Sequence, residues 1–282
     1  MQIGKYKIDY VQTGLFALDG GAMFGVVPKP LWEKTNIPDG KNRITLGGRC
    51  LILLSDSKKI LIDTGIGGDW DEKFNGIYRV EESNPNIINA LVAKNINPAE
   101  ITDVILTHLH FDHTGGSTYF DGNKFVPTFP NAKYYVRQEH FNWSKNPTEK
   151  DRASFVENRY MPLVEEGILN FLQNQLQFDD EIEFILINGH TFAQQMIKIS
   201  DSTNTLLYCG DLMPFSAHVP VPYVMGYDLQ PMETMKEKKK ILPLAAEENW
   251  KIFFEHDPET VAATIQNTGK GFAVKEKFKG LL

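Results

Sequence analysis

The sequence of 282 residues predicts an α/β (α+β) protein, a four-layer αββα sandwich that forms a single domain over residues 1–282. Three observations predict this class. Short apolar runs end abruptly in polar residues, which is typical of strands buried on both faces and covered by helices. Helical segments separate some of these strands, whereas other strands follow one another directly. Hydrophobic residues make up 42% of the chain and charged residues 23%, which is the balance of a packed globular protein.

Each predicted strand is a β-rich run followed by a polar residue, often beside a glycine. The clearest runs are 60–62 before Asp63-Thr64-Gly65, 104–106 before Thr107-His108, 184–187 before Asn188-Gly189-His190, 206–209 before Gly210-Asp211, and 252–254 before Glu255-His256. Direct pairing of neighbouring strands is expected over residues 41–63 and 181–209.

The predicted helices carry start signals or apolar residues at helical spacing. Asn84-Pro85 has the form of an N-cap and a first helical residue, ahead of an apolar face that continues to Val92. Asn97-Pro98-Ala99-Glu100 has the form of a capping box, which predicts one short turn before the next strand. Helices are also expected over 137–145, 151–166 and 231–249. The basic run from Lys236 to Lys240 is interpreted as a solvated helix face.

Charge and composition limit the function classes. The formal net charge of −7 argues against a nucleic-acid surface, which needs clustered Lys and Arg. The N-terminal stretch has no apolar signal region, and no run approaches the roughly 18 apolar residues of a membrane helix. Cys50 and Cys209 lie in apolar runs, which predicts buried free thiols. We therefore expect a cytoplasmic enzyme that acts on a small molecule and binds neither nucleic acid nor membrane; a homodimer is a further possibility.

The most informative stretch is the H-x-H-x-D-H motif at residues 108–113. In extended backbone, side chains two positions apart point the same way, so His108 and His110 can bind one ion together. A turn after them brings Asp112 and His113 to a neighbouring ion. Imidazole and carboxylate are ligands that suit zinc and other first-row metals. This pattern arises by chance in about one chain in 4,000 of this composition, which favours a metal site over a packing cluster.

Polar residues at distant strand ends can complete both ligand sets. His190 is the candidate third ligand of the first ion, and His256 serves the second. Asp211 follows its own strand and can bridge both ions with its two carboxylate oxygens. Taken singly, each of these residues also fits a plain strand end or a turn.

Taken in this order, the motif, the lone His, the Asp and the last His resemble the metallo-β-lactamase superfamily over nearly the whole chain. The resemblance implies a metallo-β-lactamase fold. It places His108, His110 and His190 on one metal, Asp112, His113 and His256 on the other, and Asp211 on both. It also implies that Asp63, in Asp63-Thr64-Gly65, accepts hydrogen bonds behind the ligands.

Softer stretches resemble the branch that contains quorum-quenching N-acyl homoserine lactonases and methyl parathion hydrolase. They are 21–28, 146–150, 210–214 and 256–258. Some lactonases carry a Tyr three residues after the bridging Asp, but this chain has Pro214 there. His218 is a candidate substitute, although a structural role for it is also expected. With Met23, Phe24 and Tyr223, it forms the predicted substrate pocket.

The predicted activity is therefore that of a dinuclear metal-dependent hydrolase. Two divalent ions, zinc in the first place and iron or manganese as alternatives, share a water and lower its pKa, so that a bridging hydroxide opens a lactone or cleaves an ester. Asp112 and Asp211 are the predicted catalytic residues, which orient the nucleophile. A phosphotriesterase or a β-lactamase-type hydrolase is the alternative. A non-catalytic metal- or ligand-binding protein on the same scaffold is an alternative of another class.

Overall fold

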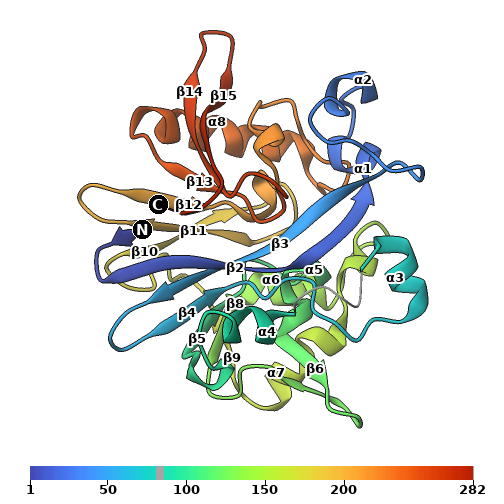
Figure 1. Cartoon of the computed structure of the whole chain (residues 1–282), viewed down its shortest axis with the longest axis vertical. Coiled ribbons are helices and arrows are strands. Elements are labelled where there is room, and N and C mark those ends of the chain that lie inside the picture. The colour runs from blue at the N-terminus through green and yellow to red at the C-terminus, as the bar shows by residue number, and fades with distance from the viewer. Residues whose placement is uncertain (81–85, 282) are drawn as a thin grey trace. The chain divides into compact units, whose positions relative to one another are not determined.

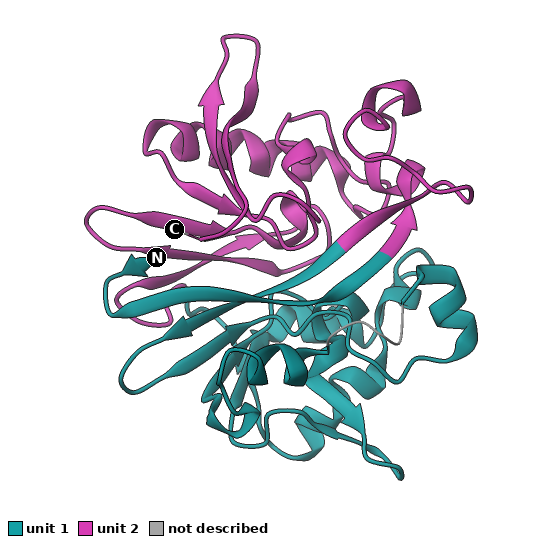
Figure 2. Cartoon of the chain, viewed as in Figure 1, with its two compact units in different colours: residues 1–16, 47–175 teal, residues 17–46, 176–282 magenta. Residues whose placement is uncertain are grey.

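The computed structural model describes residues 1–80 and 86–281. The chain divides into two compact units, each with its own sheet and helices (Figure 2). Unit 1 comprises residues 1–16 and 47–175, and unit 2 comprises residues 17–46 and 176–282. The single domain over residues 1–282 stays a prediction.

Unit 1 is built on a seven-stranded sheet of order β1-β2-β3-β4-β5-β8-β9 (Figure 1), of which the end of β2 (17–19) and the start of β3 (43–46) belong to unit 2. The strands are β1 (Gln2–Ile3), β2 (Tyr6–Asp19), β3 (Arg43–Leu54), β4 (Lys59–Ile62), β5 (Asp103–Ile105), β8 (Lys133–Arg137) and β9 (Leu169–Leu172). Strands β3 and β4 pair directly, as predicted for 41–63, and are antiparallel, whereas β4, β5, β8 and β9 run parallel to one another. Parallel strands end at one edge of a sheet, so the residues after β4 and β5 lie side by side.

Short helical segments and one small hairpin complete unit 1. They are α3 (Glu72–Tyr78), α4 (Ile87–Val92), η1 (Pro98–Glu100), α5 (Phe111–Thr114), η2 (Gly115–Ser117), β6 (Thr118–Phe120), β7 (Phe125–Pro127), α6 (Gln138–Ser144), η3 (Arg152–Ser154), η4 (Glu157–Arg159) and α7 (Met161–Glu165). The capping box at Asn97 is confirmed, and α6 confirms the helix expected over 137–145. The predicted start at Asn84-Pro85 lies outside the described residues; Asn86 caps α4.

The prediction of one helix over 151–166 is wrong. The segment contains η3, η4 and α7, separated by extended residues. Phe155 has extended backbone and forms a β-bridge with His110, which takes it out of helical geometry. Pro162 has no N–H to donate within a helix, so it is tolerated only in the first turn of α7.

Unit 2 contains a six-stranded sheet of order β10-β11-β12-β13-β14-β15. Its elements are α1 (Gly20–Phe24), α2 (Lys29–Trp32), β10 (Ile182–Ile187), β11 (Gln194–Ser200), β12 (Thr205–Tyr208), η5 (Gly210–Leu212), η6 (Ser216–His218), α8 (Pro231–Glu247), β13 (Lys251–Phe253), β14 (Ala262–Asn267) and β15 (Phe272–Phe278). The pairs β10–β11 and β11–β12 are antiparallel, as predicted for 181–209, and β12–β13 is parallel. Helix α8 confirms the helix expected over 231–249 and packs beside β14 (Figure 1).

Each unit has its own hydrophobic core. In unit 1, Val104 and Tyr134 of the sheet pack with Leu91 of α4 and Leu163 of α7. In unit 2, Ile241 and Leu242 of α8 pack on the sheet around Leu207 and Ile252. Cys50 belongs to the first core and Cys209 to the second, and both are free buried thiols, as predicted. Among the described residues, no helix has the length and apolar character needed to cross a membrane.

Two residues of the run 236–240, Glu237 and Lys238, are buried and so are not part of a solvated face. Lys238 is fully buried on α8, and its Nζ donates hydrogen bonds to the carbonyls of His218, Pro220 and Tyr223, the last two at 2.8 and 2.9 Å. Three carbonyl dipoles replace the water that a buried ammonium would lose. The prediction of a solvated helix face is therefore wrong at Glu237 and Lys238, because both lie on the one face of α8 that is buried along its length.

Candidate metal centre

In unit 1, the predicted ligands lie where the chain leaves β5. His108 and His110 stand in extended backbone, and α5 then begins at Phe111 and carries Asp112 and His113. The His108 Nε2 and His110 Nδ1 atoms are 3.1 Å apart. Ligand atoms of Asp112 and His113 lie within 4.8 Å of each other. The motif thus forms two neighbouring ligand pairs, one in the extended segment and one in the turn.

Asp63 supports this segment from the end of β4. Its carboxylate accepts hydrogen bonds from the Thr107 N–H and hydroxyl, both at 2.7 Å, and lies 3.0 Å from His113 Nδ1. Because His113 donates its Nδ1 proton to a carboxylate, its Nε2 lone pair is left for a ligand. Asp63 adopts a φ of +54°, a left-handed conformation that costs free energy unless such contacts fix it.

A buried histidine outside the motif holds the extended pair. His140, on α6, accepts a hydrogen bond from the N–H of Leu109, the residue between His108 and His110, at 2.8 Å. The Thr107 hydroxyl lies 3.0 Å from His108 Nδ1, which leaves His108 Nε2 facing His110. The sequence analysis gave His140 no role. Only its histidine identity marks it, since its spacing from residue 108 fits no helix or strand period.

The turn after the motif is locked against the loop after β4. A Cβ at Gly115 would lie 1.9 Å from the Ile66 carbonyl oxygen, and one at Gly116 would lie 2.3 Å from that of Thr64. The close backbone approach predicted for Gly115-Gly116 is therefore present. The Thr64 N–H and hydroxyl both donate to the His113 carbonyl, at 2.8 and 2.9 Å.

In unit 2, three predicted ligands follow three strands of one sheet. His190 follows β10, Asp211 lies in η5 after β12, and His256 follows β13. The Asp211 Oδ2 atom is 3.2 Å from His190 Nε2, and its Oδ1 atom is 3.3 Å from His256 Nε2. Each carboxylate oxygen thus faces a different imidazole, which is the geometry that a bridging carboxylate requires.

Asp228 supports His190 from behind. His190 Nδ1–H donates to Asp228 at 2.9 Å, and the other oxygen of Asp228 accepts from the Thr234 hydroxyl on α8, also at 2.9 Å. The contact fixes the tautomer and orientation of His190. Asp228 could not be found from the sequence, because it lies in a loop and its distance from residue 190 reflects no local period.

These donor sets fit divalent metal ions. His113 and His190 each engage a carboxylate through Nδ1, and His108 engages a hydroxyl, so their Nε2 atoms remain for coordination. Neutral imidazoles with carboxylates are the ligands of hydrolytic zinc and iron sites. The convergence of ligands from both units on a shared pair of ions stays a prediction.

Three of the predicted pocket residues form a stacked cluster in unit 2. His218 Nε2–H donates to the Met23 carbonyl at 2.8 Å, and its ring stacks on Phe24 with centroids 4.7 Å apart. Burial lowers the pKa of His218 to about 3, so the imidazole is neutral near pH 7. Phe24 also stacks on Trp32, at 5.3 Å. These contacts indicate a structural role for His218. Pro214 stands at the position where some lactonases carry a Tyr, and its carbonyl accepts a hydrogen bond from the His256 N–H.

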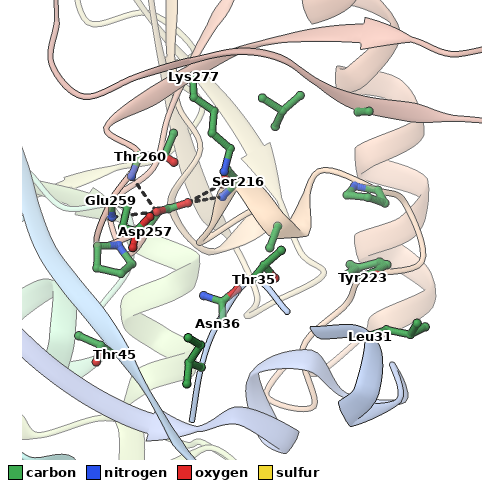
Figure 3. Close-up of a pocket in the computed structure, with 16 residues that line it drawn as sticks. Leu31, Thr35, Asn36, Thr45, Ser216, Tyr223, Asp257, Glu259, Thr260 and Lys277 are labelled. Carbon is green, nitrogen blue, oxygen red and sulfur yellow. Dashed lines mark hydrogen bonds between the residues drawn. The ribbon is translucent and has the colours of Figure 1, made fainter. Parts of the chain in front are cut away.

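Tyr223 lines a pocket of about 480 Å³ in unit 2 (Figure 3). The Asp257 carboxylate at this pocket accepts hydrogen bonds from Ser216 and from the backbone of Glu259 and Thr260. It thereby fixes the loop that directly follows His256.

Unit 1 contains an aromatic cluster that the sequence analysis did not predict. We name Trp70, Phe74, Tyr78 and Phe111 the aromatic wall. Ring centroids are 4.0 Å apart for Trp70–Phe74, 4.4 Å for Phe74–Tyr78 and 4.9 Å for Tyr78–Phe111. Phe111 stands inside the motif, next to Asp112, and α3 buries none of its own residues. The signal in the sequence is the spacing of four residues from Trp70 to Phe74 to Tyr78.

The wall borders a charged group of the candidate site. The pKa of Tyr78 is raised by burial and, to a smaller extent, by the negative charge of Asp112. A half-buried apolar face beside predicted ligands is suited to an apolar part of a substrate.

Comparison with known proteins agrees with these features. The sequence profile of the metallo-β-lactamase superfamily matches residues 44–256. An N-acyl homoserine lactonase, AttM, from Rhizobium johnstonii is 22% identical, over 82% of this chain and 82% of that protein.

Two solved structures cover almost the whole chain. A probable metal-dependent hydrolase from Staphylococcus aureus has a TM-score of 0.87 and 28% identity, over 99% of this chain and all of that one. AidC, a dizinc quorum-quenching lactonase in complex with the product N-hexanoyl-L-homoserine, has a TM-score of 0.81 and 20% identity, over 99% and 97% of the two chains. The predicted fold class is confirmed.

Proposed function

The chain belongs to the metallo-β-lactamase superfamily and is a metal-dependent hydrolase, and from this premise we propose that it opens N-acyl homoserine lactones or closely related acyl lactones. The observation that carries the proposal is Asp211, whose two oxygens face His190 and His256. Such a carboxylate can bind two ions at once. The motif in unit 1 also supports two ions, because it contains two ligand pairs.

Two ions are proposed, zinc in the first place. His108, His110 and His190 would hold one of them; Asp112, His113 and His256 would hold the other, with Asp211 on both. Divalent ions held there would polarise the substrate carbonyl and make water more acidic.

The substrate class rests on two supports. AttM and AidC, which resemble this chain, are lactonases by name, and the AidC structure holds an acyl-homoserine product. The aromatic wall provides apolar rings next to Asp112, which suits an acyl chain better than a small polar substrate.

Opening the lactone adds one water. The water oxygen bonds to the carbonyl carbon, the bond from that carbon to the ring oxygen breaks, and the ring oxygen leaves as a hydroxyl. We assign Asp112 and Asp211 to orienting the water, and Asp211 to carrying the proton that ends on the leaving oxygen. Three residues hold the proposed ligands in place: Asp63 contacts His113, His140 binds the backbone between His108 and His110, and Asp228 contacts His190.

A substrate panel tests the proposal. The metal-free protein is loaded in turn with Zn²⁺, Mn²⁺ or Fe²⁺ and assayed on acyl homoserine lactones, an aryl ester, a phosphotriester and a β-lactam. We expect kcat/KM for a lactone to exceed the other values at least about hundredfold, because a site fitted to one reaction discriminates by transition-state contacts. A chelator should abolish turnover and added metal should restore it.

Other outcomes reassign the chain. A phosphotriester or β-lactam as the best substrate would replace the lactone proposal by that class. No turnover by a fully loaded protein would indicate a binding protein on the same scaffold.

A further inference from the structure

Arg159, the last residue of η4, is fully buried in unit 1. Its guanidinium donates to the carbonyls of Gly68 at 2.5 Å, Asp69 at 3.3 Å and Gly115 at 3.3 Å. Gly68 and Asp69 belong to the loop after β4, and Gly115 directly follows the metal-binding motif. One side chain therefore joins the two segments that carry Asp63 and His113.

The same guanidinium is enclosed by two aromatic rings. Its central carbon lies 3.9 Å from the ring centroid of Trp70 and 4.7 Å from that of Phe125 on β7. A desolvated cation over an indole face is a favourable contact that also fixes the ring plane. Trp70 in turn donates its indole N–H to the Ile66 carbonyl at 2.9 Å. Arg159 thus contacts the aromatic wall directly.

The loop that Arg159 binds has a costly backbone. Asp63, Gly65, Gly67 and Asp69 all have positive φ, between 54° and 71°. Aspartate in this region is less stable than glycine, and a Cβ at Gly67 would lie 2.1 Å from the Gly115 carbonyl oxygen. Such a loop keeps its shape only when outside groups hold it. Arg159 provides such a hold through the carbonyls of Gly68 and Asp69, next to Trp70 in the chain.

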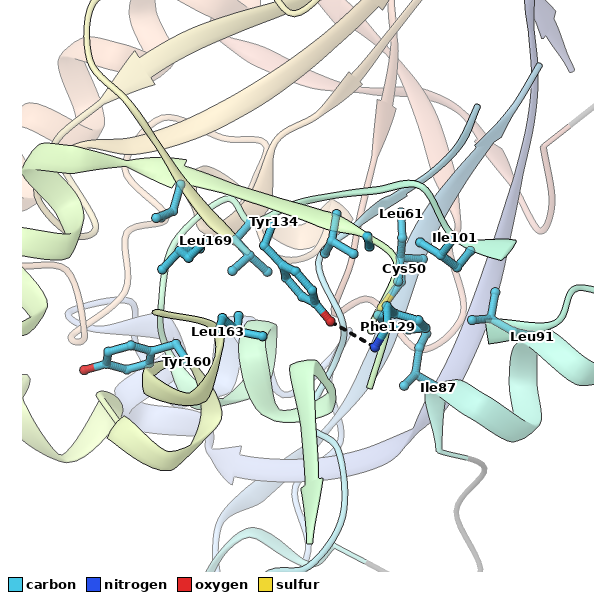
Figure 4. Packing of buried hydrophobic residues seen from close by; sticks show 14 of the residues in the cluster. Cys50, Leu61, Ile87, Leu91, Ile101, Phe129, Tyr134, Tyr160, Leu163 and Leu169 are labelled. Atoms are coloured by element: carbon cyan, nitrogen blue, oxygen red, sulfur yellow. Dashed lines mark hydrogen bonds between the residues drawn. The ribbon is translucent and has the colours of Figure 1, made fainter. Parts of the chain in front are cut away.

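Arg159 itself has a fixed base. The next residue, Tyr160, and Leu163 of α7 belong to the unit 1 core, which also contains Leu169 (Figure 4). A rigid backbone on one side and three carbonyls on the other leave the guanidinium little freedom. Burial lowers the pKa of Arg159 to about 10, so it stays charged near neutral pH.

We propose that Arg159 is a positioning residue that ties the aromatic wall to the metal-binding segment and so sets the preference for long apolar chains on the substrate. This inference rests on the proposed function for its substrate, but its geometry stands on unit 1 alone. A lysine cannot replace the arginine, because an ammonium has no planar face to stack on Trp70 and so cannot set the plane of that ring.

Arg159→Lys tests the proposal, with Arg152→Lys as the matched control, since Arg152 is exposed on the neighbouring η3. In Zn²⁺-loaded protein we expect KM for N-decanoyl homoserine lactone to rise about tenfold, the size of a lost desolvated cation–π contact. KM for the N-butanoyl lactone and kcat for both should change less than about twofold, with metal content retained. Equal effects on both chain lengths, or none on either, would overturn it.

Two further measurements keep the test decisive. Phe125→Leu removes the other face of the enclosure and should shift KM in the same direction by about threefold, even if Arg159→Lys fails to fold. Acrylamide quenching, taken as the difference between each protein and its Trp70→Phe counterpart, reports Trp70 without any substrate. We expect Trp70 to become more accessible in Arg159→Lys. If the wild type opens no lactone, the proposed function is wrong. If acrylamide quenching of Trp70 is the same in Arg159→Lys as in the wild type, the positioning role is wrong, whatever the substrate.

Discussion

The two units hold their predicted metal ligands in different ways. In unit 1 the four ligands lie within residues 108–113, and the support comes from Asp63, Thr107 and His140. In unit 2 the three ligands are spread from residue 190 to residue 256, each after its own strand. A contiguous group depends on one turn, whereas a dispersed group depends on the register of a whole sheet.

Each unit has a buried cationic side chain that binds the backbone of loops: residues 68, 69 and 115 in unit 1, and residues 218, 220 and 223 in unit 2. Arg159 binds three carbonyls and two rings in unit 1, and Lys238 binds three carbonyls in unit 2. In this chain the arginine sets the plane of a ring, whereas the lysine only holds a loop closed.

The largest effect is expected at Asp211, which contacts both other predicted ligands of unit 2, His190 and His256. Asp211→Asn keeps the size of the side chain but removes its charge, so we expect kcat/KM to fall at least about a thousandfold. Steady-state kinetics on metal-loaded protein checks it, with the exposed Asp201→Asn in the same unit as control. Activity within tenfold of wild type would refute the bridging role.

The supporting carboxylates give a direct contrast between the units. Asp63→Asn and Asp228→Asn should each weaken metal affinity about 10- to 100-fold, as is typical when a partner of a ligating histidine is lost. Competition with a chromophoric chelator measures both. If only Asp63→Asn has an effect, the dispersed ligands of unit 2 do not need this support.

The buried lysine should matter for stability more than for chemistry. Lys238→Met removes three hydrogen bonds and leaves three carbonyls in a buried region, so we expect the free energy of unfolding to fall by about 2–4 kcal/mol. Urea denaturation measures it, with the exposed Lys239→Met next to it as control. An unchanged midpoint would show that water replaces the ammonium at no cost.

The buried imidazole of His218 predicts a pH dependence of the free energy of unfolding. Its pKa falls from 6.5 in the unfolded chain to about 3 in the folded one, so the unfolded state binds the extra proton. Stability is fully present above pH 6.5 and falls as the pH drops towards 3, by about 1.4 kcal/mol per pH unit. His218→Gln should have a shallower acid slope in denaturation series at several pH values. Equal slopes would contradict the buried neutral imidazole.

The smallest effect is expected at the aromatic wall. Tyr78→Phe keeps the ring and removes only the hydroxyl, so kcat/KM for the N-decanoyl lactone should change less than about twofold. Steady-state kinetics checks it, with Tyr78→Ala as the variant that does remove the ring. A loss above a hundredfold in Tyr78→Phe would show that the phenol itself acts on the substrate.

Sequence patterns predicted the local parts of this molecule well. The strand end before Asp63, the ends of β5 and β12 to within one residue, the capping box at Asn97 and the ligand pairs of the motif depend on neighbours in sequence. These features follow from backbone periodicity and residue chemistry, which a single sequence contains.

The supporting residues could not be predicted in the same way. His140, Asp228 and Arg159 act through contacts 31, 38 and 44 residues away in sequence, which only the tertiary fold brings about. The helix expected over 151–166 failed for a related reason, because the bridge from Phe155 to His110 overrides local propensity. Lys238 was misassigned because its charge alone does not show that it lies on the buried face of α8.

Ligands from both units are predicted to bind the same pair of ions. Metal content of the wild type, His110→Ala, His190→Ala and the double variant, measured by inductively coupled plasma mass spectrometry, tests it most directly. We predict two ions in the wild type, one in each single variant and one in the double variant, because both histidines hold the same ion. A double variant that loses both ions while each single variant loses one would assign His110 and His190 to separate ions and contradict the account.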